Sequence, residues 1–160
     1  MTQTLAATLP ENFLLHIHKE IEIGAPPAIV FESLLDEIGP ANEMPDGRSM
    51  SMKIEPWPGG RWFRDLGNNA GHLWGHVQVI KPPMLLELCG PLFMSYPAIS
   101  HVQYRLTEQG KGTRLTLTHK ALGDMAQEHR EGVVQGWTHI LERIRKSAEK
   151  TKDSSNAKKS

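Results

Sequence analysis

The chain has 160 residues, and its 18 basic and 18 acidic side chains give a formal charge of zero. This balance argues against a general nucleic-acid or anionic-membrane binder, which needs a basic surface. The length suffices for one domain with a sizeable core. A single cysteine, Cys89, excludes an internal disulfide and favours a reducing, cytoplasmic setting. We expect neither a signal peptide nor a membrane span, which takes an apolar run of ~20 residues.

Alternating apolar and polar side chains predict a first strand over residues 15–23. Ala25-Pro26-Pro27 then begins a helix that ends at Ile38, since proline is tolerated in a first helical turn. Glycine, proline and asparagine turns bound the further predicted strands, which span residues 50–54, 61–66, 72–80, 84–89, 99–108 and 113–120. Short connections between consecutive strands imply a largely antiparallel sheet.

The last predicted element is a long helix over residues 123–150. Apolar side chains recur three or four positions apart along one of its faces, at Val133, Trp137, Leu141, Ile144 and Ala148. Such a face must be buried, and the sheet offers the large apolar surface that it needs. We therefore expect one domain over residues 14–150. Residues 1–13 are predicted to be a flexible arm, and residues 151–160, without an apolar anchor, a disordered tail.

Short patterns occur in a fixed order along the chain: Ile23-Gly24-Ala25-Pro26-Pro27, Pro58-Gly59-Gly60-Arg61-Trp62, Gly75-His76-Val77 with Ile80-Lys81-Pro82-Pro83, residues 112–119, and Gly136-Trp137. Together they resemble the START-like (SRPBCC) superfamily, in its branch of activators of the heat-shock-protein-90 ATPase and their bacterial homologues. The resemblance implies an α+β helix-grip fold, in which a curved antiparallel sheet of about six or seven strands wraps around a long C-terminal helix. It also implies a hydrophobic cavity. The superfamily includes lipid carriers, polyketide cyclases and co-chaperones.

Large, soft side chains suit irregular apolar ligands, and the chain offers such a set in Met50, Met52, Trp62, Trp74 and Trp137. For any single member we favour plain core packing, and the hypothesis of a ligand contact concerns the set as a whole. The candidates that we expect to contact a ligand are Met50, Met52, Trp62, Arg64, Tyr104, Leu117, His119, Val133 and Trp137.

Two polar candidates point toward the predicted interior. His119 shares an apolar face with Leu115 and Leu117, so it is a candidate acid or base; the alternative, which we favour, is a structural hydrogen bond to a backbone group. Arg64 alternates onto the face of Trp62. It would anchor an acidic group of a ligand, reach out at a rim or, as we favour, form an ion pair with an acidic side chain.

We expect no cofactor and no metal. His16 and His18 could share an ion, but their strand face also carries acidic side chains, which is typical of a solvent-exposed face. The apolar segment 91–97 could close the cavity as a lid or join two subunits in a homodimer.

Three functions remain open at this point. The favoured one is binding of a small apolar or aromatic ligand. The second is a polyketide cyclase/dehydrase-like or hydrolase-like enzyme that uses the same cavity, with His119, Arg64 or Tyr104 as acid–base groups. The third is a co-chaperone-like protein partner. Such a role would use an exposed surface, and the even balance of charges indicates no strongly charged patch for it.

Overall fold

The structure, a computed structural model, describes residues 10–93 and 97–160. Residues 1–9 of the predicted arm, and Met94, Ser95 and Tyr96 of the apolar segment, lie outside the described residues. In chain order the elements are η1 (Glu11–Phe13), β1 (Leu14–Ile23), α1 (Pro27–Ile38), β2 (Lys53–Ile54), β3 (Arg61–Gly67), β4 (Ala70–Lys81), β5 (Leu85–Gly90), β6 (Ala98–Gln109), β7 (Gly112–Gly123) and α2 (Gln127–Ala157).

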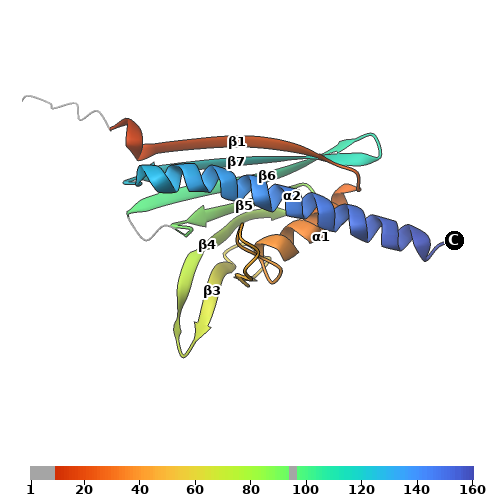
Figure 1. The fold of residues 1–160 in the computed structure, drawn as a ribbon, viewed down its shortest axis with the longest axis horizontal. Coiled ribbons are helices and arrows are strands. Elements are labelled where there is room, and N and C mark those ends of the chain that lie inside the picture. Colours follow the sequence, from red (N-terminus) through yellow and green to blue (C-terminus); the bar gives the residue numbers. More distant parts are fainter. Residues whose placement is uncertain (1–9, 94–96) are drawn as a thin grey trace, which may run out of the picture.

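The strands form one seven-stranded antiparallel sheet in the order β1-β7-β6-β5-β4-β3-β2. The long helix α2 lies across one face of this sheet, and α1 lies beside it (Figure 1). The strands β3 and β4 run steeply away from the direction of β1 and β7 (Figure 1). The predicted fold class, a curved antiparallel sheet around a long C-terminal helix, is confirmed.

The apolar stripe of α2 is buried as its spacing predicts. Its members are at most 5% exposed: Val133, Trp137, Leu141, Ile144 and Ala148. Each large side chain that leaves water here stabilises the fold by roughly 1.5–3 kcal/mol. The helix α1 adds Val30, Phe31, Leu34 and Ile38 to the same core. Within the described part of the chain, no helix combines the length and apolar character that a membrane crossing requires.

The structure differs from the sequence prediction at the C-terminus, where residues 151–160 were expected to be disordered. The helix α2 continues to Ala157. Extending an existing helix is far easier than nucleating one, so these residues need no buried stripe of their own. Lys152 also ties this end of the helix down, because its Nζ donates to the carbonyl oxygen of Gly24 at 2.8 Å.

The predicted strand over residues 50–54 is shorter in the structure and comprises Lys53–Ile54 alone. The backbone N–H groups of Met50 and Met52 donate instead to the carbonyl oxygens of Asn42 (2.9 Å) and Gly39 (3.0 Å). These bonds fold residues 39–52 into a compact loop, called the α1–β2 loop below, which lies against the helices.

Two glycines set the point at which β4 separates from β5. A methyl group on Gly75 would lie 2.5 Å from the carbonyl oxygen of Cys89, and one on Gly90 would lie 2.5 Å from that of Trp74. The ladder between the strands starts next to this contact, at His76 and Cys89. Residues 70–75 pair with β3 alone among the described strands, so the β3–β4 hairpin is free to bend away from the sheet.

We predict that Gly75→Ala destabilises the protein by about 1–3 kcal/mol, because backbone atoms must move to admit the methyl group. Gly132→Ala is the matched control, because its methyl group would meet nothing within 4 Å. Alanine is more stable than glycine in a helix interior by up to ~1 kcal/mol, so this variant should be at least as stable as the wild type. Urea denaturation of both variants measures the two effects. A Gly75→Ala variant as stable as the wild type would contradict the close approach.

Candidate ligand-binding site

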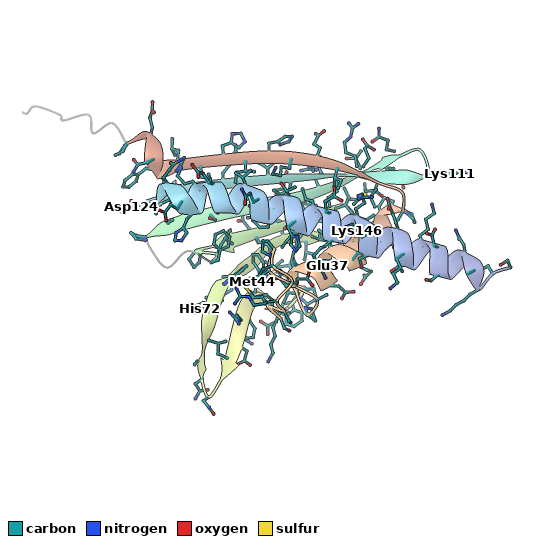
Figure 2. All side chains as sticks on the ribbon, in the orientation of Figure 1. Glu37, Met44, His72, Lys111, Asp124 and Lys146 are labelled. Carbon is teal, nitrogen blue, oxygen red and sulfur yellow. The ribbon has the colours of Figure 1, made fainter. Side chains whose placement is uncertain are left out.

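A pocket of about 320 Å³ lies between the N-terminal half of α2, the α1–β2 loop and the base of the β3–β4 hairpin. Nearly all of its lining surface is apolar. Figure 2 shows Met44, a member of the loop, beside β4 and below α2. The residues that border the pocket are Asn42, Glu43, Met44, Pro45, Met50, Trp62, Trp74, Phe93, His129, Gly132, Val133, Gly136, Trp137, His139 and Ile140.

An aromatic wall closes the sheet side of this pocket. Trp62 pairs with Gly75 in the β3–β4 ladder and Phe63 pairs with Leu73, which leaves Trp74 as the extra residue of a β-bulge. The bulge brings the rings of Trp62 and Trp74 edge to face, with centroids 5.1 Å apart. Phe93 continues the wall, with its ring centroid 5.5 Å from that of Trp74. The result is a large, rigid apolar surface.

The helix side of the pocket is kept open by glycine. Gly132 and Gly136 lie four residues apart and so share one face of α2. A side-chain carbon on either would meet nothing within 4 Å. A glycine inside a helix costs roughly 0.5–1 kcal/mol relative to alanine, and here that cost coincides with unfilled space. The two missing side chains contribute directly to the volume of the pocket.

Charged groups hold the loop against both helices at one end of the pocket. Arg143 on α2 bonds through Nε to Glu37 Oε2 on α1 and through Nη1 to Glu43 Oε1 on the loop, both at 2.7 Å. Glu37, with 6% of its surface exposed, thereby has the partner that a buried carboxylate needs. His139 borders the same end, with Nε2 3.8 Å from Glu43 Oε1.

Asn42 completes this end of the pocket, which we call the polar end: Asn42, Glu43 and His139. Asn42 is 2% exposed, and its Nδ2 donates to the carbonyl oxygen of Glu37 at 3.0 Å. Its Oδ1 and the Nε2 of His139 are buried without a hydrogen-bond partner among the described residues. A buried polar atom left unpaired costs about 1–3 kcal/mol. Each of these atoms would therefore be stabilised by a hydrogen-bond partner of matching polarity.

The model of the family described as "Activator of Hsp90 ATPase homolog 1-like protein" matches residues 25–149. The chain belongs to this family. The match confirms the resemblance to the START-like (SRPBCC) superfamily and to this branch of it. No curated protein shows significant similarity to this family member.

Solved structures of low sequence identity share the fold of this Hsp90-activator-like chain. Protein MLL2253 from Mesorhizobium loti is 18% identical, with a TM-score of 0.63, over 85% of this chain and 98% of that one. CalU16 from Micromonospora echinospora is 24% identical, with a TM-score of 0.60, over 83% of this chain and 75% of that one. The di-domain ARO/CYC StfQ from the steffimycin biosynthetic pathway is 10% identical, with a TM-score of 0.64, over 89% of this chain and 53% of that one. Likeness at these identities shows the fold alone.

Four of the sequence-predicted contact residues border the pocket of this family member: Met50, Trp62, Val133 and Trp137. The others do not: Met52, Arg64, Tyr104, Leu117 and His119. Met52 and Leu117 are core residues at most 1% exposed. The hydroxyl of Tyr104 is fully buried, and burial raises its pKa. Side-chain parity separated the two faces of the sheet but could not tell a filled core from an open pocket.

The prediction that Arg64 points into the interior and pairs with an acid differs from the structure. Arg64 is partly exposed, and no ion pair to it occurs among the described residues. It pairs in the ladder with His72, which lies on the part of the hairpin that projects away from α2 (Figure 2). The bend of the hairpin carries Arg64 out of the core, so its charge stays in contact with water.

Pocket residues that sequence reasoning missed come largely from the α1–β2 loop and from the glycines of α2. Loop side chains such as Met44 follow no periodic pattern that would place them. The pair Gly132 and Gly136 does leave a signal, since two glycines four apart inside a helical pattern imply a depression in one helix face. The charged residues at the start of α2 give no sign in the sequence that His129, which lies among them, borders the pocket.

His119 has a structural role in this arrangement. The indole Nε1 of Trp137 can only donate, so His119 Nδ1 accepts its hydrogen bond, at 3.0 Å. The proton of the neutral ring is then on Nε2, which donates to Ser100 Oγ at 2.9 Å. With both nitrogens engaged and its ring 0% exposed, His119 cannot act as the base that activates Ser100. Its partners are side chains and not the backbone group that we expected.

The buried imidazole predicts a loss of stability in mild acid. Burial lowers the pKa of His119 from 6.5 to about 4, and the nearby His101 adds a smaller effect. Between these values the unfolded chain binds a proton that the folded chain does not. The stabilisation is therefore complete above pH 6.5 and is lost as the pH falls toward 4, by up to about 3 kcal/mol.

Urea denaturation at several pH values in this window measures the effect. His119→Gln keeps a donor and an acceptor but has no titrating group, so its free energy of unfolding should depend less steeply on pH than that of the wild type. Equal slopes for the two proteins would show that His119 is not the buried neutral group described above.

Proposed function

We propose that this chain binds a small apolar, aromatic molecule in the pocket under the N-terminal half of α2. The observation that carries the proposal is the pocket itself, about 320 Å³ with an almost wholly apolar lining that includes Trp62, Trp74 and Trp137. This volume lies within the usual range of small-molecule sites, ~300–1,000 Å³. Edge-to-face aromatic side chains offer flat, rigid contact surface to an aromatic guest.

An enzyme of the cyclase or hydrolase type would have to use other acid–base groups than those expected from the sequence. His119, Arg64 and Tyr104 lie outside the pocket, whereas Glu43 and His139 border it with 3.8 Å between Oε1 and Nε2. This pair is the specific observation in favour of an enzyme as the second candidate. Formation of a product that His139→Gln abolishes would favour it over simple binding.

Two further expectations remain predictions. A co-chaperone-like role is suggested by the family description alone, and recovery of a chaperone with the intact chain would support it. A cytoplasmic location rests on the single cysteine and the absence of a disulfide framework.

We predict that Gly136→Phe fills the pocket and weakens the binding of an aromatic probe at least tenfold. The new ring has open space before it, so the fold should remain as stable as the wild type or become more so. The probe is 2-naphthol, with its dissociation constant measured by calorimetry and its stabilisation of the fold by thermal shift.

Gly136→Ala is the matched control, because alanine removes the cost of a glycine in the helix but leaves most of the pocket empty. It should bind 2-naphthol within a few-fold of the wild type. Failure of the wild type to bind 2-naphthol, naphthalene or other aromatic probes would refute the proposed function. Equal binding by Gly136→Phe and the wild type would place the ligand elsewhere.

A further inference from the structure

The amide of Asn42 has a fixed orientation. Its nitrogen faces the carbonyl oxygen of Glu37, which can only accept, so the atom at 3.0 Å must be Nδ2 and cannot be the amide oxygen. The backbone of Asn42 is held as well, because its N–H donates to Gly39 and its carbonyl oxygen accepts from Met50, at 3.0 and 2.9 Å. Oδ1 is consequently a buried acceptor on a residue that lines the pocket, and its position does not depend on a ligand.

A second unpaired atom lies at the same end. His139 Nε2 is buried without a hydrogen-bond partner among the described residues, and it is 3.8 Å from the carboxylate of Glu43, the residue next to Asn42. An imidazole nitrogen donates or accepts according to its tautomer. A hydroxyl group is small and both donates and accepts, so it can satisfy Asn42 Oδ1 and match either state of His139.

The charges around the polar end oppose an acidic ligand. Glu37 and Glu43 place two carboxylates there against the single guanidinium of Arg143, which is engaged with both. Two of the three indole donors that border the pocket are also engaged: Trp62 Nε1 donates to the carbonyl oxygen of Ile38 and Trp137 Nε1 to His119. A ligand carboxylate would lie close to hydrogen-bond acceptors and to negatively charged side chains. Burying it there without a donor or a positive partner would cost free energy.

Building on the proposed function, we infer that the ligand of this pocket is an uncharged aromatic molecule bearing a hydroxyl group. Its rings lie against the aromatic wall, and its hydroxyl donates to Asn42 Oδ1 at the polar end. The class comprises phenols and aryl alcohols and excludes aromatic acids.

Three probes of one ring system test this inference on the intact protein: 2-naphthol, 2-methoxynaphthalene and 2-naphthoate. The methyl ether keeps the oxygen but loses the donor, so we expect it to bind roughly fivefold to tenfold more weakly than the naphthol, the effect of one hydrogen bond. We expect 2-naphthoate to bind most weakly of the three. Calorimetry at one salt concentration gives all three dissociation constants.

Two variants locate the effect. Asn42→Leu removes the acceptor and should bring the naphthol and its methyl ether to equal affinity. Met50→Ala, a change elsewhere in the pocket lining, should weaken both probes by the same factor and preserve their ratio. The wild-type comparison stands without any variant, should Asn42→Leu fail to fold.

The outcomes separate the inference from the function on which it rests. Equal affinity of the wild type for the naphthol and its methyl ether, tight binding of 2-naphthoate, or a folded Asn42→Leu variant that keeps the wild-type preference would each overturn the hydroxyl assignment while the pocket remains a binding site. If none of the aromatic probes bound, the proposed function itself would fall.

Discussion

The structure depends on one requirement: the apolar stripe of α2 must be buried, and the sheet covers only part of its length closely. Toward its C-terminal half, Leu141, Ile144 and Ala148 pack into a filled core together with α1. Toward its N-terminal half the hairpin bends away and two glycines remove the side chains that would fill the gap. The same helix therefore stabilises the fold along one half and borders a pocket along the other.

Trp137 lies at the boundary between these two halves. Its ring borders the pocket, its Nε1 donates to His119 in the core, and its ring is nearly perpendicular to that of Tyr104, with centroids 6.3 Å apart. Because the polar atom of the indole is satisfied inside the core, the surface that it shows to the pocket is purely apolar. A buried histidine thus fixes the orientation of an aromatic pocket residue on α2 without bordering the pocket itself.

The periodic parts of the chain were predictable from its sequence, and the aperiodic parts were not. The stripe from Val133 to Ala148 has the period of a helix, and each of its members is buried as expected. By contrast, strand alternation placed Tyr104 and His119 correctly on the inner face but could not show that both are sealed in the core. The bulge at Trp74 and the bend that exposes Arg64 arise from contacts between strands that no local pattern encodes. The contribution of Asn42 depends on where a glycine- and proline-containing loop folds, which is settled by tertiary hydrogen bonds.

The ion pairs of Arg143 have a consequence for how a guest would be accommodated. They join the loop to α1 and α2 at the same time, so the polar end is already assembled before anything enters. Association then requires little ordering of the chain, a saving in conformational entropy that flexible sites do not have. Such a preorganised cavity cannot reshape itself around a poorly matched molecule. Discrimination between guests would then come from the rigidity of the pocket and from the cost of leaving its buried polar atoms without a hydrogen-bond partner when the wrong guest binds.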